Sequence, residues 1–402
     1  MAEDGPRTEE ILPIAAQGDL LLRVEYGTAD SPAIYSFRVD SSVLKSHSKY
    51  FDRLLQNDRF SEGTAIRVQH DRLVEQYGQL TAAPSSELPA ITIVDVGRIS
   101  AVRAIDALVS DFLSILHGDE IQASPPVPNL ANLAIVADRF DALDVVKSYV
   151  KRKKILRALD GKTTAKVDAG LSEEKVRQRL LVAIYFDYPP WLEKYSARLI
   201  IKGWVGNEMD TSSPLWWDLP SRVEEELMVR RDAVLNTIQS VQAHFLTLYT
   251  SRQQRCRLGY ENSVQCDSFQ LGEMIRFFTR IGTLDLQGTL LPTNDPAVPY
   301  TGDINTLLES MRQIPEYQID RFHTHCGIRT GLLPILSVLE AYLQRIGICA
   351  ECWQEGRREY SWLEQKPAFI WKRQDLQSKF QGHGNRHSAV RELFTAAERH
   401  WT

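Results

Sequence analysis

The 402-residue sequence has only five cysteines and no apolar run of the roughly 20 residues that a membrane-spanning helix requires. A small and odd number of cysteines argues against a disulfide framework and favours a reducing compartment, the cytoplasm or the nucleus. The formal net charge is only −5, which gives no reason to expect direct binding to nucleic acid or to an anionic membrane.

Several enzyme motifs are also absent. The sequence has no Gly-x-Ser-x-Gly, no His-Glu-x-x-His and no Gly-x-Gly-x-x-Gly, the patterns of hydrolases, zinc proteases and dinucleotide-binding enzymes. Gly161-Lys-Thr163 matches the end of a phosphate-binding loop, but Leu156 stands where that motif needs its first glycine. The sequence therefore predicts a protein that is not an enzyme.

Alternating side chains near the N-terminus predict a β-hairpin. Residues 20–26 and 35–39 each place apolar or aromatic side chains at every second position, and a turn-rich segment separates them. A short helix capped by Ser46 or Ser48 should follow and end at Gly63. The hairpin and this helix predict a compact domain that begins near residue 16.

The same domain should continue with one more strand and three helices. A strand is expected at 91–95 and a helix over 100–117, and helical spacing then recurs around Leu133 and Val146. The basic run 151–154 is interpreted either as the solvated end of a helix or as a nuclear import signal. We therefore expect an α+β domain over residues 16–154.

This order of elements, with its apolar anchors, resembles the BTB/POZ domain, a small sheet flanked by helices. The segment 64–90, rich in Ser, Pro and Gln, departs from the family and is interpreted as an insertion. The resemblance implies protein association. The motifs that carry it are Gly18-Asp19, Phe37-Arg-Val39, Tyr50-Phe51, Phe60-Ser-Glu-Gly63, Phe112-Leu-Ser-Ile-Leu-His-Gly118 and Leu133-Ala-Ile-Val-Ala-Asp-Arg-Phe140.

The resemblance also implies two interaction sites. The family associates through an apolar surface, with itself or another BTB protein, and Leu21, Val43 and Leu44 are candidates here, the alternative being domain core. Some members recruit a cullin-type ubiquitin ligase scaffold through an apolar residue, any residue and glutamate. Val109-Ser-Asp111 has a similar place with aspartate for glutamate, and its alternative is a plain helix surface.

The rest of the chain predicts a mostly α-helical C-terminal domain. A linker is expected at 155–171, the helical domain at 172–365 and a polar, basic tail at 366–402. One long amphipathic helix should run over 223–248, with Arg230 and Arg231 on a solvated, charged face. Within the tail, 382–387 is interpreted as a flexible connection.

Cysteines and histidines give the helical domain its candidate metal site. Thiolate and imidazole groups suit Zn²⁺, which takes four such ligands when it is structural. The residues concerned are Cys256, Cys266, His323, His325, Cys326, Cys349 and Cys352.

Two sets of four ligands compete. The region from Cys256 to about 343 resembles the C-terminal part of fungal BTB-domain proteins of unassigned function, and this favours Cys256, Cys266, His323 and Cys326, with His325 as the alternate to His323. His323 and Cys326 with Cys349 and Cys352 form the second set. The alternative to both is that the thiols are small buried apolar groups.

The resulting functional prediction is an interaction scaffold or adaptor. A BTB-like domain would associate with itself or a partner, and the helical domain, held by zinc, would bind something else. A nuclear regulator of transcription is the alternative, although no DNA-reading module is visible. A zinc or thiol enzyme would require an open metal position or a nucleophile with an oxyanion site.

Overall fold

The computed structural model describes residues 11–28, 31–56, 60–100, 104–121, 125–206, 210, 212–256, 258–284, 300–354, 361–364, 366, 368–373 and 382–401. The chain is a mixed α+β protein, 59% helical, with a small sheet near the N-terminus and helices after it. It divides into unit 1, Met1–Tyr188 with Glu208–Pro220, and unit 2, Pro189–Asn207 with Ser221–Thr402. Within the described ranges, no helix combines the length and the apolar character needed to cross a membrane.

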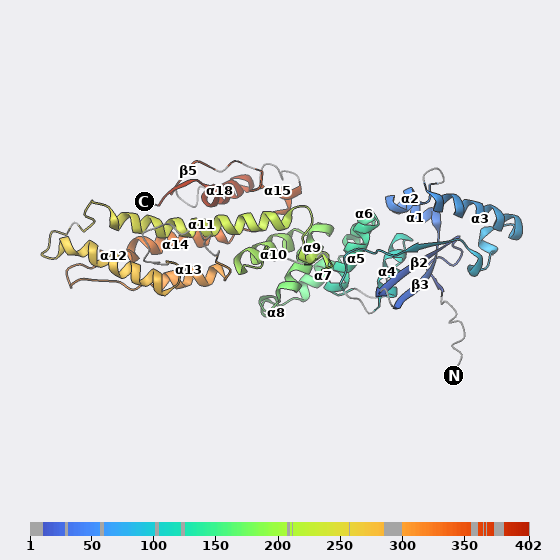
Figure 1. Cartoon of the computed structure of the whole chain (residues 1–402), viewed down its shortest axis with the longest axis horizontal. Helices are drawn as coiled ribbons and strands as arrows, with labels where there is room; N and C mark the ends of the chain where they lie inside the picture. The colour runs from blue at the N-terminus through green and yellow to red at the C-terminus, as the bar shows by residue number, and fades with distance from the viewer. Residues whose placement is uncertain are drawn as a thin grey trace, which may run out of the picture. The chain divides into compact units, whose positions relative to one another are not determined.

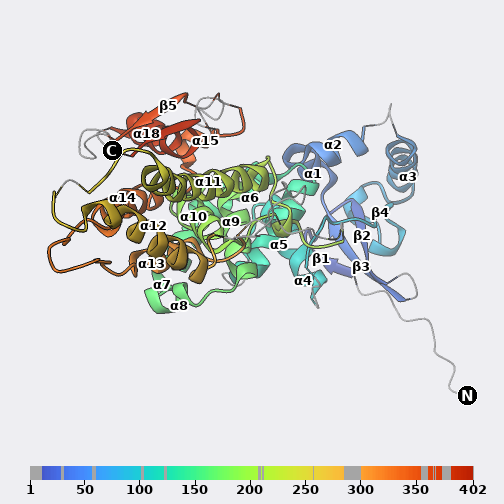
Figure 2. The same ribbon diagram turned by 60° about the vertical axis from the view of Figure 1, so that its left-hand side comes forward.

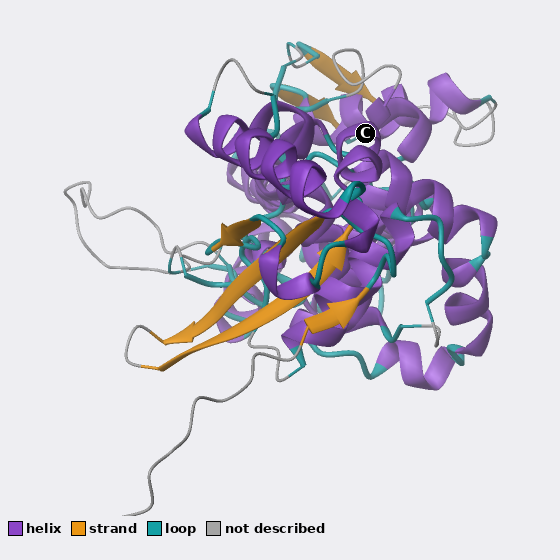
Figure 3. Ribbon diagram, turned by 90° about the vertical axis from the view of Figure 1, so that its right-hand side faces the viewer, coloured by secondary structure: helices purple, strands orange, loops and turns teal. Residues whose placement is uncertain are grey.

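Unit 1 contains a four-stranded sheet in which the predicted hairpin is confirmed (Figure 3). The strands β2 and β3 are antiparallel, and Leu22 is paired with Phe37. The outer strands β1 and β4 run parallel to β3 and β2 respectively. The strands are β1 (Ile11–Pro13), β2 (Leu20–Thr28), β3 (Ser31–Val39) and β4 (Ala90–Ile93), in the order β1-β3-β2-β4.

Nine α-helices and three 3-10 turns complete the described part of unit 1. Ser48 caps α2, because its hydroxyl accepts a hydrogen bond from the backbone of Phe51 and donates one to the carbonyl of Phe140. The rings of Phe51 and Phe140 stack 5.3 Å apart in the core. The elements are α1 (Ser41–His47), α2 (Lys49–Leu54), α3 (Ser61–Tyr77), α4 (Ile105–Leu116), α5 (Val127–Arg139), α6 (Leu143–Arg152), α7 (Ile155–Lys162), α8 (Ala165–Ala169), α9 (Glu173–Phe186), η1 (Leu80–Ala82), η2 (Ser85–Glu87) and η3 (Leu215–Trp217).

One helix boundary differs from its prediction. Gly63 does not end the helix that follows the hairpin; it lies in the first turn of α3, whose N-cap is Phe60. A Cβ atom at Gly63 would lie 2.9 Å from the carbonyl oxygen of Gln56. Glycine is therefore needed here for close backbone approach and not as a helix stop. The interval 64–90 holds most of α3 with η1 and η2, and 155–171 holds α7 and α8.

Most of the apolar residues expected on an association surface lie in the core. Leu21 is 2% exposed and packs with Leu73 and neighbours from the segment after α3. Leu44 and Val109 are also buried, because α1 and α4 turn these positions inward. Val43 and Asp111 keep partly exposed side chains. Leu21 and Leu44 therefore lie in the core of unit 1, as their alternative interpretation predicts, whereas the burial of Val109 differs from the plain helix surface given as its alternative.

Unit 2 is built around one long helix, α11, as the heptad-like spacing predicts. Figures 1 and 2 show α11 with α18 and β5 on one side and α12, α13 and α14 on the other. The short strands β5 and β6 pair in parallel. The elements are α10 (Pro189–Lys202), α11 (Val223–Thr250), α12 (Ser263–Arg280), α13 (Ile304–Arg312), α14 (Arg329–Leu343), α15 (Ala350–Gln354), β5 (Ile370–Lys372), α18 (His383–Thr395) and β6 (Glu398–His400).

The expectation that Arg230 and Arg231 are solvated is wrong. They are 7% and 5% exposed. Arg231 donates to the carbonyl of Ile200 at 2.7 Å, near the end of α10, and to that of Gly302 at 2.7 Å. Carbonyls at the end of a helix have no partner within the helix, and a buried guanidinium supplies the missing donors.

The interpretation of 382–387 as a flexible connection is also wrong. Gly382 adopts a φ of 83° and is followed directly by α18, which begins at His383. The later turns of this helix bury Ala389, Val390, Leu393 and Phe394. This apolar face stabilises the helix, although its first turn is polar.

Candidate metal centre

The four residues of the favoured ligand set come from three parts of unit 2. Cys256 follows the end of α11, and Cys266 lies in the first turn of α12. His323 and Cys326 lie in the connection between α13 and α14. Each residue is thus placed at or near a helix end, where loops from separate helices converge.

The structure brings these side chains together. The ligand atoms of Cys256, Cys266 and His323 all lie within 4.8 Å of one another, and all three residues are buried. The sulfur of Cys326 lies 4.0 Å from that of Cys256. In a tetrahedral zinc site with bonds of about 2.3 Å, two thiolate sulfurs are about 3.8 Å apart. Cys256, Cys266 and His323 therefore have separations that one metal ion can bridge, and Cys326 adjoins this group through its contact with Cys256.

His323 is oriented for coordination by its neighbours. Its Nδ1 lies 2.8 Å from a carboxylate oxygen of Asp320. That carboxylate also accepts hydrogen bonds from Asn262 and from the backbone of Phe322, each at 2.8 Å. The other ring nitrogen, Nε2, is buried and has no hydrogen-bond partner among the described residues. A carboxylate on one nitrogen with the other nitrogen directed at thiols is the usual arrangement of a histidine that binds metal.

The charges in the site follow from the same contacts. Hydrogen bonds from Asn262 and His323 lower the pKa of Asp320 to about 2, and the Asp320 hydrogen bond raises the pKa of His323. Burial raises the pKa values of Cys266 and Cys326, and the neighbouring Cys256 adds to both increases.

Cys256 differs from the other two thiols. Burial tends to raise its pKa, but hydrogen bonds from the Leu258 backbone and from Ser263 outweigh this and lower it. Three thiols this close cannot all ionise without a compensating charge, and a divalent cation supplies one.

Hydrogen bonds hold the loops that carry the ligands. The backbone amides of Arg255 and Cys256 donate to the carboxylate of Asp267, at 2.6 and 3.0 Å. The hydroxyl of Tyr249 donates to the carbonyl of Cys326 at 2.8 Å. The end of α11, the start of α12 and the 323–326 loop are therefore fixed to one another by the protein itself.

The alternatives to this set are not brought together. His325 is exposed, and its Nδ1 lies 3.1 Å from Glu316, outside the group of thiols. Its left-handed backbone, with a φ of 64°, interrupts the loop between His323 and Cys326. Cys349 and Cys352 do not join His323 and Cys326; they lie in a separate group with His383 and His387.

That separate group escaped the sequence reasoning, and so did Asp320. The signals were present, since Cys349 and Cys352 are three positions apart and His383 and His387 are four apart, which is zinc-site spacing. Spacing alone does not join the two pairs, because 30 residues separate Cys352 from His383 and the histidines lie in a polar stretch. The chain thus carries two Cys/His groups that could hold a metal ion.

No family model, no curated protein and no solved structure matches this chain. The resemblance to BTB proteins therefore depends on the sequence motifs alone, and the assignment of a metal depends on the geometry of the side chains.

Proposed function

We propose that the chain is an interaction scaffold or adaptor whose helical unit is held in shape by one structural Zn²⁺ at Cys256, Cys266, His323 and Cys326. The observation that carries this proposal is the buried Nε2 of His323, which has no hydrogen-bond partner among the described residues and lies beside the thiols. Leaving such a nitrogen unpaired in the interior costs about 1–3 kcal/mol, and coordination removes that cost.

The ligand set favours a structural role over a catalytic one. Catalytic zinc keeps one coordination position for water or substrate, and it usually has three protein ligands. Here three thiols and one imidazole supply four, and His323, Cys256 and Cys266 are buried. Zinc in this environment would connect α11, α12 and the 323–326 loop.

Exposed aromatic side chains next to the ligands support the scaffold role. Tyr260 lies between the first two cysteines in sequence and is 50% exposed, and Phe322 precedes His323 and is 51% exposed. Their rings lie 5.4 Å apart, and the guanidinium of Arg321 lies 4.7 Å from the Phe322 ring centre. Aromatic and arginine side chains supply most of the binding energy in protein interfaces. We call Tyr260, Arg321 and Phe322 the aromatic tip.

The BTB resemblance adds an association role for unit 1. The partners that it implies are a second copy of this chain, another BTB protein or a cullin-type scaffold. Asp111 and Val43 are the positions from the expected interaction set with accessible side chains, so a partner that binds the folded unit would contact these two. The N-terminal unit would then hold one partner and the aromatic tip another.

Metal analysis of the full-length chain tests the zinc site. We expect His323→Ala and Cys256→Ser to lose one equivalent of zinc relative to the unchanged protein. His325→Ala is the matched control, since that histidine is exposed and lies outside the group, and it should keep the full metal content. Equal zinc content in the His323 and His325 variants would contradict the proposed site.

Partner binding tests the scaffold role separately. Quantitative co-purification should show a defined set of proteins that the double variant Tyr260→Ser/Phe322→Ser loses while it retains its zinc. Val68→Ser, at an exposed apolar position on α3, serves as the control and should keep those partners. If the double variant and the control retain the same proteins in equal amounts, the aromatic tip is not a binding surface.

A further inference from the structure

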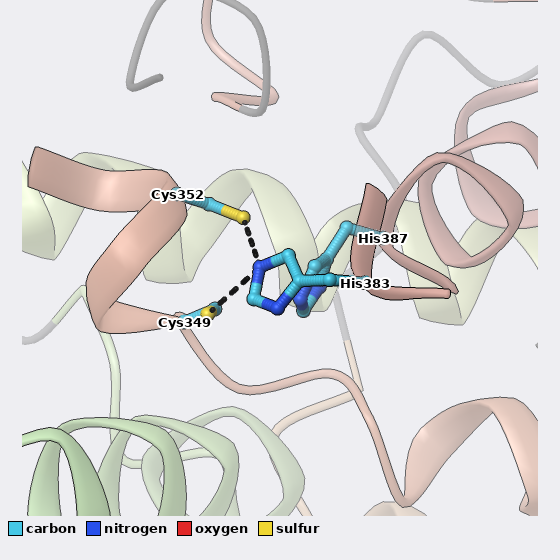
Figure 4. A group of neighbouring side chains, drawn as sticks. All are labelled: Cys349, Cys352, His383 and His387. Atoms are coloured by element: carbon cyan, nitrogen blue, oxygen red, sulfur yellow. Dashed lines mark hydrogen bonds between the residues drawn. The ribbon is translucent and has the colours of Figure 1, made fainter. Parts of the chain in front are cut away.

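A second group of metal-binding side chains lies elsewhere in unit 2. Cys349 immediately precedes α15 and Cys352 lies within it, and His383 and His387 lie in the first two turns of α18. Figure 4 shows His383 directed between the two thiols, with His387 next to it. One ligand atom from each of the four residues lies within 4.8 Å of the others.

The spacing within each pair places both members on one side of its element. Residues four apart on a helix share a face, so the start of α18 directs His383 and His387 the same way. Two residues between cysteines is the usual spacing of a zinc-binding turn, and Cys349-Ala-Glu-Cys352 provides it. The two cysteines and the two histidines therefore face each other. We call Cys349-Ala-Glu-Cys352 the cysteine arm and His383 with His387 the histidine arm.

The distances agree with tetrahedral coordination. The Nε2 of His383 lies 3.6 Å from the sulfur of Cys349 and 3.1 Å from that of Cys352. With zinc bonds of about 2.3 Å to sulfur and 2.0–2.1 Å to nitrogen, a sulfur and a nitrogen ligand are about 3.6 Å apart. The Nδ1 of His383 lies 3.3 Å from the carboxylate of Glu351. This repeats the carboxylate and imidazole arrangement of Asp320 and His323.

Hydrogen bonds connect the segments that carry both arms to α11. Arg230 donates to the carbonyls of Ile346 and Gly347, at 2.8 and 2.9 Å, just before the cysteine arm. On the other side, Thr237 donates to the carbonyl of Phe394 in α18 at 3.3 Å. The arms are thus positioned by contacts that do not involve the four ligands.

A buried positive charge also lies close to the thiols. Arg230 lines the same small pocket as Cys349, Cys352 and His387. Burial raises the pKa of Cys352, and the neighbouring Arg230 guanidinium opposes that shift.

We propose that Cys349, Cys352, His383 and His387 bind a second Zn²⁺, which fastens the start of α18 to α15. On binding, the two thiols release two protons to solvent, and the two thiolates balance the charge of the ion while the imidazoles bind as neutral groups. The second site is the more accessible of the two, because Cys349 is partly exposed and the His383 side chain is 44% exposed. A chelator should therefore remove zinc from this site first.

Metal stoichiometry of site-specific variants of the full-length chain tests this site independently of the first. We expect two zinc ions per unchanged chain, one in Cys352→Ser, one in His383→Ala and none when either change is combined with His323→Ala. His383→Ala is included because its partly exposed side chain can be removed without disturbing the core. His400→Ala changes an exposed histidine in β6 and should leave both ions bound.

Two further measurements complete the test. Cobalt in place of zinc should give a thiolate-to-metal absorption band in His323→Ala, where only the second site is intact. Hydrogen exchange at the start of α18 should become faster in His383→Ala and remain unchanged in His400→Ala. A single zinc per unchanged chain that is lost in His323→Ala and retained in His383→Ala would overturn the proposal. Replacement of the two thiols by a Cys349 to Cys352 disulfide in the purified chain would overturn it as well.

Discussion

Replacing Glu226 by glutamine should strongly destabilise unit 2. Glu226 has no exposed surface, and its carboxylate accepts from Arg230 at 2.9 Å, from the hydroxyl of Ser361 at 2.9 Å and from the backbone of Trp362. Glutamine has nearly the same shape but no charge, so Arg230 would remain buried without a counter-ion. Removing one partner of a buried ion pair costs about 3–5 kcal/mol, and we expect a loss of that size.

The assay must separate unit 2 from unit 1. Hydrogen exchange of α11 peptides over a series of urea concentrations reports the unfolding free energy of the helix that carries Glu226. Glu225→Gln is the matched control, because Glu225, in the first turn of α11, pairs with the N-cap residue Arg222 and both side chains are more than half exposed. No measurable shift is expected there.

A double variant makes the reasoning refutable. In Glu226→Gln/Arg230→Met the unpaired charge is gone, so its loss of stability should be smaller than the sum of the two single losses by at least about 2 kcal/mol. Equal shifts in Glu226→Gln and Glu225→Gln would refute the idea that α11 depends on this buried pair. If the loss of stability in the double variant equals the sum of the two single losses, the argument from the unpaired charge is refuted. The packing of the two side chains would then explain the single losses.

The surroundings of four other residues predict the effects of replacing them. At the proposed first zinc site, Asp320→Asn should weaken zinc binding about 10- to 100-fold without abolishing it, as measured by chelator competition, because the supporting carboxylate is lost. Gly347→Ala should destabilise unit 2 by about 1–3 kcal/mol in urea unfolding, since its Cβ would lie 2.1 Å from the Glu193 carbonyl oxygen. Gly272→Ala, whose Cβ meets nothing within 4 Å inside α12, should instead be neutral or stabilising. Burial raises the pKa of Asp111, so at higher pH, where the side chain is ionised, its partly buried charge destabilises unit 1. Asp111→Asn should then stabilise unit 1 by up to about 0.5 kcal/mol at pH 7 in thermal unfolding, and the gain should vanish as the pH falls to the unfolded-state pKa.

Patterns that act over a few residues could be predicted from the sequence. The alternation over 20–26 and 35–39 predicts β2 and β3, and the spacing over 223–248 predicts α11. In both patterns, the apolar positions identify the side of the strand or helix that packs against the core. The favoured ligand set is suggested by a resemblance and not by spacing, and three of its members, Cys256, Cys266 and His323, lie together in the structure.

Features that depend on distant partners could not be predicted in this way. Arg230 and Arg231 occupy charged positions of an amphipathic pattern, and only the carbonyls of Ile346 and Ile200, from remote segments, explain their burial. The helix α18 begins with a polar turn, and its apolar face packs on α11. The second metal group depends on that helix, and no local sequence pattern places the start of α18 beside α15.

The length of α11 has a consequence for cooperativity. Its 28 residues extend about 42 Å at 1.5 Å per residue. One Cys/His group adjoins Arg230 near its first turns, and the other includes Cys256 beyond its last turn. Between them, Val234 and Val241 have no exposed surface and hold the middle of the helix independently of either group. If both groups bind metal as proposed, its removal should fray the two ends separately while the centre stays protected, so that unit 2 passes through partly unfolded states and does not melt in one step.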